Sequence, residues 1–249
     1  MAGLLELTEL RRSFGAVAAV DGIDLAVAPG ELLSIIGPNG AGKTTLFNCI
    51  TGELAPTGGR VRFDGSDITG WPPHRLPALG IARSFQRTSV FASLTVAQNV
   101  WVAAHGCAPR DPFAALKPAD AAVGVRAVIA EALGLVGLDR HADKPADALS
   151  HGDQRLLDFA IALAARPRLL LLDEPTAGLS RGDTQMVIGL IERLKGRYTI
   201  LLIEHKMDVV MRLSDRIAVM YFGRKLAEGA PEAIRADPRV REAYLGKRA

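Results

Sequence analysis

The sequence predicts an α/β fold with a parallel-sheet core, an antiparallel β flap beside it and an inserted α-helical subdomain. Two continuous apolar runs, Arg168 to Pro175 and Tyr198 to His205, are typical of parallel strands that are covered on both faces. The dipeptide Asp64-Gly65 separates two β-type runs within Gly59 to Ile68, which predicts an antiparallel hairpin. From about 87 to 166 the chain is rich in Ala and Leu with helical character.

The other elements fit around these three features. We expect a strand at Glu31 to Ile36 with a helix after it at Thr44 to Ile50, and a helix within Ala119 to Leu138. A helix at about Asp183 to Lys195 lies between the two apolar runs and completes a βαβ unit. Residues Arg216 to Gly229 predict a strand, a turn at Gly223 and a second strand, ahead of a short helical tail. We expect one domain over 1–249, in which 1–86 and 167–249 form the α/β core with its flap and 87–166 form the helical subdomain.

Composition narrows the classes of function. The chain of 249 residues carries 30 Lys+Arg against 27 Asp+Glu without a dense basic run, which favours an ordinary mixed surface over a nucleic-acid interface. The two cysteines, Cys49 and Cys107, are far apart and indicate neither a disulfide framework nor a zinc site, and they suit a reducing cytosol. The first residues carry Glu6 and Glu9 where a signal peptide needs an apolar core, and no apolar run approaches a membrane span. We therefore expect no nucleic-acid partner and a chain that does not cross a membrane by itself.

The stretch "GPNGAGKTT" matches the pattern Gly-x-x-x-x-Gly-Lys-Ser/Thr of a phosphate-binding loop. Its glycines let successive N–H groups point into one concavity, and the helix after it adds the positive end of its dipole. Lys43 is expected to reach the terminal phosphates and Thr44 to hold Mg²⁺. The alternative is a Gly-rich turn that merely opens a helix, but the strand before the loop and the helix after it favour a P-loop NTPase (RecA-like) core. The residues expected to contact the nucleotide are Gly37, Pro38, Asn39, Gly40, Ala41, Gly42, Lys43, Thr44 and Thr45.

Four polar residues are candidates for the chemistry on the bound phosphates. Asp173 and Glu174 end an apolar strand, at the edge where open α/β sheets bind ligands. We expect Asp173 to hold Mg²⁺ and Glu174 to polarise the attacking water, rather than a plain acidic turn. His205 ends the next strand and could hydrogen-bond the γ-phosphate, whereas a lone histidine at a strand end is usually structural. Gln86 could reach Mg²⁺ or the water, or be an ordinary polar loop residue.

The stretch "LSHGDQR", Leu149 to Arg155, has two interpretations. Ser150 with Asp153 three residues later is a variant of the helix capping box. A cap does not explain Gly152, which weakens a first helical turn but lets a ligand come close to the backbone. A helix N-terminus with a serine hydroxyl and a bare glycine is also suited to an anion. We expect this second site to bind the γ-phosphate of ATP held by another subunit.

Together these motifs resemble the ATP-binding cassette (ABC) ATPases over essentially the whole chain. "GPNGAGKTT", "SFQ", "LSHGDQR", "LLLLDEPTAGLS" and "LIEH" occur in that family's order and approximate spacing. The resemblance implies ATP hydrolysis by two subunits that close head to tail on two ATP molecules, with Ser150 and Gly152 acting on the partner's nucleotide. It also implies that Phe14 stacks on adenine, with Ala18 in the same nucleotide site, although by sequence alone Phe14 would pass for a core residue. The implied catalytic residues are Lys43, Gln86, Glu174 and His205, and the implied metal ligands are Thr44, Gln86 and Asp173.

Within that family the chain is most similar to the ATP-binding subunits of branched-chain amino-acid importers. The stretches "GIARSFQRTSVFASLTVAQNV", "LLIEHKMDVVM" and "AYLG" carry this closer resemblance. It implies a second ATPase subunit, identical or different, two membrane permeases and indirectly a periplasmic binding protein. It also implies a peripheral position at the cytoplasmic face of the inner membrane. We expect the permease contact at about Thr88 to Val102, because this stretch follows Gln86.

Three alternatives remain open at the level of sequence. One is a cassette transporter for another cargo, such as urea, short amides or an exported lipid. Another is a soluble cassette protein that acts on DNA or ribosomes, although such proteins usually carry two cassettes or basic insertions. The third is a P-loop kinase, which has no use for "LSHGDQR".

Three positions, in two motifs, depart from the family's usual pattern. The stretch "LSHGDQR", which corresponds to the family's signature motif, carries His151 and Asp153 where most members have Gly and Gln. We expect the carboxylate of Asp153 either to weaken closure on a phosphate or to face away as a capping residue. Ser180 stands where many members have Asp at the dimer seam, so communication between the two sites is expected to differ.

Overall fold

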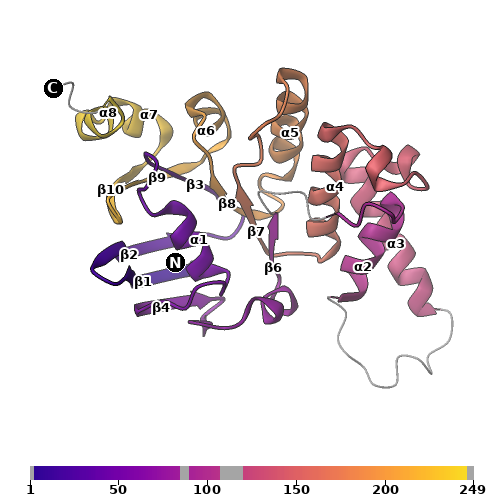
Figure 1. The fold of residues 1–249 in the computed structure, drawn as a ribbon, viewed down its shortest axis with the longest axis horizontal. Coiled ribbons are helices and arrows are strands. Elements are labelled where there is room, and N and C mark those ends of the chain that lie inside the picture. The colour runs from indigo at the N-terminus through magenta and orange to yellow at the C-terminus, as the bar shows by residue number, and fades with distance from the viewer. Residues whose placement is uncertain (1–2, 85–89, 107–119, 246–249) are drawn as a thin grey trace.

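The computed structural model of the chain describes residues 3–84, 90–106 and 120–245. Within them the chain forms two sheets, with a group of helices at one end of the molecule (Figure 1). The larger sheet has six strands in the order β10-β9-β3-β8-β7-β6. Their bounds are β3 Leu32–Ile36, β6 Ile81–Ser84, β7 Leu169–Asp173, β8 Thr199–Ile203, β9 Arg216–Tyr221 and β10 Arg224–Gly229.

The larger sheet is parallel except at one edge. Strand β3 pairs in parallel with β8 and β9, and β7 pairs in parallel with β8 and β6, while β10 is antiparallel to β9. Every residue of β3, β7 and β8 is buried, as expected of apolar runs covered on both faces. The predicted parallel core is confirmed. The short strand β6 was not anticipated, since "IARS" has too few apolar residues to stand out.

The smaller sheet is the antiparallel flap, in the order β2-β1-β4-β5. The predicted hairpin is present: β4 (Gly58–Phe63) pairs with β5 (Ser66–Asp67), and the turn residues Asp64 and Gly65 both have positive φ, 50° and 77°. The flap is larger than expected, because β1 (Leu5–Phe14) and β2 (Val17–Val27) are ten and eleven residues long. Register shifts at bulges interrupt their pairing, which blurs the alternation that identifies a strand in sequence.

The helices fall into two groups. In the helical region α2 (Val96–Gly106), α3 (Asp120–Val136) and α4 (His151–Ala164) pack together at one end (Figure 1). Helix α1 (Lys43–Ile50) lies between the two sheets. The remaining helices are α5 (Arg181–Leu194), α6 (Met207–Leu213), α7 (Pro231–Ala236) and α8 (Pro238–Leu245).

Alternate side chains of the parallel strands enter two different cores. Leu170 and Leu172 face the cluster that contains the buried side chains of α4 and α5, whereas Leu169 and Leu171 face the cluster around α1 and the flap. The helical region thus shares its core with one face of the sheet. Among the described residues no helix is both long and apolar enough to cross a bilayer.

Candidate nucleotide site

The phosphate loop connects β3 to α1 and is shaped by glycines that no other residue could replace. Gly37 and Gly42 have φ of 156° and 98°. A Cβ atom at Gly37 would lie 2.2 Å from the Met220 carbonyl oxygen, and one at Gly42 would lie 2.1 Å from that of Ala19. Both glycines are therefore needed because backbone from β9 and β2 packs directly against the loop.

The loop has the features of an anion site. No side chain caps the N-terminus of α1, whose N-cap is the left-handed Gly42, and its first turn carries no acidic residue. The first-turn N–H groups and the helix dipole therefore favour a negatively charged ligand at this position. The Lys43 Nζ lies within the loop and donates to the carbonyl oxygens of Gly37 (2.7 Å) and Pro38 (3.0 Å). Burial lowers the pKa of Lys43, and the nearby carboxylates of Glu174 and Asp173 act against that shift.

The two candidate carboxylates lie at the carboxyl end of β7, next to the phosphate loop. Asp173 is buried, while the Glu174 side chain is about one quarter exposed. Glu174 has a φ of 46°, a left-handed conformation that costs a non-glycine residue free energy, and its N–H donates to the Ile203 carbonyl oxygen at 2.9 Å. This strained turn directs two successive carboxylates into different surroundings.

The structure brings His205 to Glu174. The distance between His205 Nδ1 and Glu174 Oε1 is 3.7 Å, because β8 pairs with β7 and the two strands end at the same edge. The imidazole is half exposed and therefore accessible from solvent. A carboxylate and an imidazole this close together could both act on one bound phosphate group.

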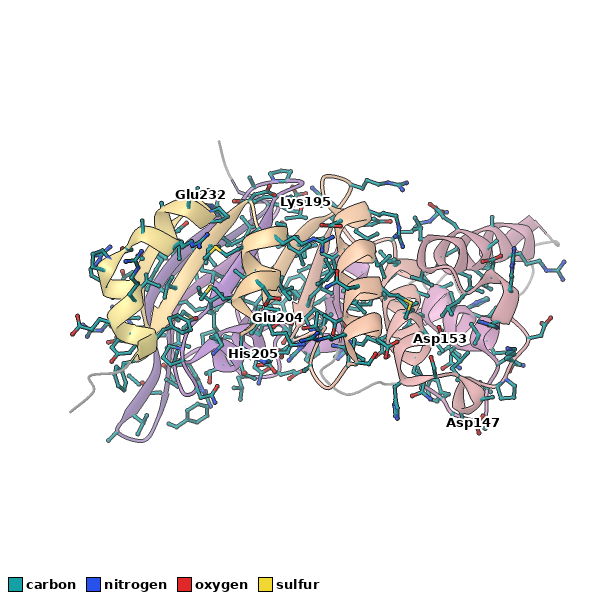
Figure 2. The ribbon with its side chains drawn as sticks, turned by 90° about the horizontal axis from the view of Figure 1, so that it is seen from above. Asp147, Asp153, Lys195, Glu204, His205 and Glu232 are labelled. Atoms are coloured by element: carbon teal, nitrogen blue, oxygen red, sulfur yellow. The ribbon has the colours of Figure 1, made fainter. Side chains whose placement is uncertain are left out.

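Two further residues support this edge, and the sequence reasoning did not single them out. Glu204 is fully buried and accepts hydrogen bonds from the Thr176 hydroxyl and from the N–H groups of His205 (2.8 Å) and Lys206 (3.1 Å). Figure 2 shows Glu204 and His205 beside each other at the end of their strand. Its position directly after an apolar strand is the sequence signal that could have identified Glu204.

Arg155 is the second missed residue. It lies on the buried face of α4 and donates from Nε to the Pro175 carbonyl oxygen (3.0 Å) and from a terminal nitrogen to that of Glu174 (3.3 Å). It also forms an ion pair with Asp158 at 3.5 Å. Burial lowers the pKa of Arg155, and Asp158 opposes that effect. Arg155 therefore ties the signature helix to the backbone that carries Glu174.

The signature motif forms the predicted capping box. Ser150 is the N-cap of α4: its hydroxyl accepts from the Asp153 N–H (3.1 Å) and donates to the Asp153 carboxylate (2.8 Å). Asp153 is thus a capping residue in this chain. In Figure 2 it lies well apart from Glu204 and His205, so the motif is distant from the phosphate site of its own chain.

What approaches Gly152 within this chain is a side chain from α5. A Cβ at Gly152 would lie 2.3 Å from Asp183 Oδ1 and 2.7 Å from its Cγ. Asp183 belongs to a second capping box, in which Ser180 caps α5 as Ser150 caps α4. Intrachain packing therefore also favours a glycine here, whereas the sequence reasoning attributed Gly152 to a ligand alone.

We expect Gly152→Ala to destabilise the chain by about 1–2 kcal/mol, since the added methyl group displaces Asp183 from its cap. The double variant Gly152→Ala/Asp183→Ala lacks the displaced carboxylate. Its loss of unfolding free energy is therefore expected to be smaller than the sum of the losses in the two single variants. Urea unfolding of the four members of this cycle measures the coupling. Strict additivity would show that the contact carries no free energy.

The other predicted residues have different positions. Phe14 is 47% exposed at the end of β1, and the Arg12 guanidinium lies 4.7 Å from its ring centroid, so the core interpretation of Phe14 is wrong. Ala18 is exposed on β2, opposite Ser13. Thr44 is exposed in the first turn of α1. Gln86 lies outside the described residues.

The protein residues at this site suit Mg²⁺ only if the phosphates of a nucleotide supply further ligands. No group of three or more His, Cys, Asp or Glu side chains that could hold a metal occurs within 3–84, 90–106 and 120–245. Thr44, in the first turn of α1, and Asp173, at the end of β7, offer oxygen ligands, and Mg²⁺ is usually held by one or two carboxylates plus substrate phosphates. The residues present therefore suit a metal that arrives with a nucleotide.

Comparison with known proteins agrees with this geometry. The family description "ABC transporter" matches residues 20–177, and "Branched-chain amino acid ATP-binding cassette transporter" matches residues 224–249. The chain is 42% identical to the high-affinity branched-chain amino acid transport ATP-binding protein BraF of Pseudomonas aeruginosa, and 41% identical to LivG of Escherichia coli. Each of these alignments covers 98% of both proteins. Among solved structures, the ADP conformation of the ATP-binding cassette MJ1267 superposes with a TM-score of 0.86 at 31% identity, over 99% of this chain and 100% of that one.

Proposed function

The chain belongs to the ATP-binding subunits of branched-chain amino-acid ABC transporters, which hydrolyse ATP to drive transport, and from this premise we propose how its residues divide that work. The phosphate loop binds the nucleotide, the edge of β7 and β8 carries the hydrolytic groups, and the helical region transmits the motion to a permease. The observation that carries the proposal is the position of Glu174 beside His205 and close to Lys43.

Binding is assigned to the loop and its flanks. The first-turn N–H groups of α1 and the Lys43 ammonium neutralise the phosphates, and the exposed Phe14 ring stacks on the adenine. Thr44 and Asp173, with Gln86, hold Mg²⁺, which supplies charge neutralisation on the phosphate oxygens. Ala18 and the remaining loop residues shape the walls around the nucleotide.

Hydrolysis is assigned to Glu174 and His205. The Glu174 carboxylate accepts a proton from the attacking water and orients it toward the γ-phosphate. His205 donates a hydrogen bond to the γ-phosphate, and Glu204 fixes the backbone N–H groups of His205 and Lys206 so that the imidazole stays at this edge. Arg155 holds the Glu174 carbonyl from α4, which connects the signature helix of the same chain to the base.

A second ATPase subunit completes each site in this proposal. Asp153, in the helical turn that Ser150 caps, lies apart from Glu204 and His205 (Figure 2), and Ser150 and Gly152 act on a nucleotide held by the other subunit. To do so the partner's phosphate must approach a helix N-terminus that already holds Asp153 and Asp183. These two carboxylates oppose closure electrostatically, and the arriving Mg²⁺ and Lys43 of the other subunit offset them.

We assign the permease contact to the stretch from about Thr88 to Val102, of which residues 88 and 89 lie outside the described residues. Phe91, Trp101 and Val102 are exposed apolar side chains, with Phe91 56% and Trp101 48% exposed. Trp101 and Val102 also line an open groove between α2 and α3, together with Leu94, Ala97 and Ile129. Because the permease lies in the inner membrane, a subunit bound to it through this surface lies at the cytoplasmic face of that membrane. The proposed cargo is a branched-chain amino acid, which a periplasmic binding protein delivers to the permease.

We expect Phe91→Asp to uncouple the subunit: ATP hydrolysis by the isolated chain changes less than twofold, while uptake of leucine in the assembled system falls at least tenfold. The physical reason is that a carboxylate replaces an apolar anchor in the permease contact, at a cost of about 1–3 kcal/mol. Met186→Asp, at an exposed apolar residue of α5, is the matched control and is expected to leave uptake intact. Full uptake by the Phe91 variant would contradict this placement.

The assembly is tested by mass spectrometry of what co-purifies with a tagged copy from detergent-solubilised native membranes, with ATP present. We expect two permeases and a second ATPase subunit. Recovery of ribosomes or nucleic acid instead would contradict the proposed partners.

A further inference from the structure

Arg83 contacts the buried carboxylate of the proposed metal site. It is the third residue of β6, where it pairs with Leu171 of β7, two residues before Asp173. One terminal nitrogen donates to Asp173 Oδ2 at 3.0 Å. The side chains of Arg83 and Asp173 are 11% and 3% exposed, so little water screens this pair.

The same guanidinium is engaged on its other side by the end of α1. Its second terminal nitrogen lies 3.0 Å from Glu53 Oε1, 3.0 Å from Asn48 Oδ1 and 3.2 Å from Thr51 Oγ1. Glu53 is 37% exposed, so its pull on the guanidinium is weaker than that of buried Asp173. Arg83 is therefore shared between two carboxylates, one in the proposed metal site and one outside it.

We propose that Arg83 is the counter-ion of Asp173 and competes with the divalent cation for this carboxylate, so that it sets the affinity of the site for Mg²⁺. This inference rests on the assignment of Asp173 to Mg²⁺ under the proposed function. Arg83 is a positioning residue: it acts on the metal through Asp173. Glu53 acts in turn through Arg83, because it draws the guanidinium away from Asp173.

The sign of the effect follows from Coulomb's law. A full positive charge beside Asp173 repels a cation of charge +2 and occupies one carboxylate oxygen. Removing that charge leaves a buried, uncompensated carboxylate, which lowers the stability of the metal-free protein and increases the gain on binding a cation. Removing Glu53 has the opposite effect, since the guanidinium then pairs with Asp173 alone.

The test is the binding of Mn²⁺ to the full chain with a non-hydrolysable ATP analogue, followed by the electron paramagnetic resonance signal of free Mn²⁺. We expect Arg83→Gln, which keeps a polar side chain but removes the charge, to bind Mn²⁺ on the order of tenfold more tightly. We expect Glu53→Gln to bind it about threefold more weakly. In the Arg83→Gln background, Glu53→Gln should have almost no further effect, because its influence passes through Arg83.

Arg168→Gln is the matched control. Arg168 forms an ion pair with Asp64 in the flap, both partners are more than half exposed, and the variant is expected to leave Mn²⁺ affinity unchanged. Unchanged or weaker Mn²⁺ binding by Arg83→Gln overturns the proposal. If that variant does not fold, Glu53→Gln decides alone, and unchanged or tighter binding overturns the proposal.

The variant Asp173→Asn tests separately whether Asp173 holds the metal at all. This variant is expected to weaken Mn²⁺ binding at least tenfold, because the amide cannot replace a carboxylate ligand. If it binds Mn²⁺ as the unaltered protein does, the assignment of Asp173 to the metal is wrong whatever the Arg83 variants do. If only the Arg83 and Glu53 variants fail to change the affinity, the metal site stands and the counter-ion proposal falls.

Discussion

Glu174→Gln is expected to lower ATP turnover by about 10²–10⁴-fold while ATP affinity stays within about twofold. The amide has nearly the shape of the carboxylate but cannot accept the proton of the attacking water. Since the left-handed turn and the bond from the Glu174 N–H to Ile203 involve only the backbone, the exchange should leave the fold of this edge intact. Release of phosphate and equilibrium binding of a fluorescent ATP analogue measure the two quantities.

The same variant should accumulate as a dimer with ATP trapped, because closure no longer ends in hydrolysis. Size-exclusion chromatography with and without ATP detects this. Glu192→Gln is the matched control: Glu192 is an exposed residue of α5 that pairs with Arg212, and its loss should change neither turnover nor dimerisation. Turnover at the unaltered rate in the Glu174 variant would remove Glu174 from the role of base.

Lys43→Ala is expected to weaken ATP binding by about tenfold to a hundredfold. This factor corresponds to the free energy that a hydrogen bond to a charged group usually contributes. Lys43 is the cation inside the phosphate loop, where it donates to the carbonyl oxygens of Gly37 and Pro38. Its burial already disfavours the charged form, so phosphates gain a cation that has lost much of its hydration. Isothermal titration with ATP and with ADP measures the loss, which should be larger for ATP.

The stability of the Lys43→Ala variant shows whether a loss of ATP binding results from unfolding. Removal of the two bonds to the loop is expected to lower the free energy of unfolding by about 1 kcal/mol, too little to unfold the chain. Lys195→Ala, which breaks a partly exposed ion pair with Asp215, should lower stability slightly and leave ATP affinity unchanged. Equal affinity for ATP in the Lys43 variant and the unaltered chain would contradict the binding role of the loop lysine.

The sequence by itself determined the features that depend on short spacing. The phosphate loop, the Asp64-Gly65 hairpin and the Ser150–Asp153 cap each rest on residues a few positions apart. The hairpin and the cap follow from local backbone preferences and local hydrogen bonds, and the loop has a fixed spacing of glycines that can be recognised in the sequence. The apolar runs also predicted a parallel sheet, and parallel strands necessarily place Asp173, Glu174 and His205 at one edge. For these residues a pattern in the sequence was sufficient.

The tertiary structure alone decided which distant groups meet. Arg83 and Asp173 are 90 residues apart, Arg155 reaches the Glu174 carbonyl from another helix, and Asp183 occupies the space beside Gly152. No spacing rule predicts such pairs, since they depend on strand order and on how helices cross the sheet. The same holds for Phe14, whose exposure depends on what the rest of the chain leaves uncovered. Sequence thus supplied the candidate chemical groups of the site, and packing determined the charges and contacts around them.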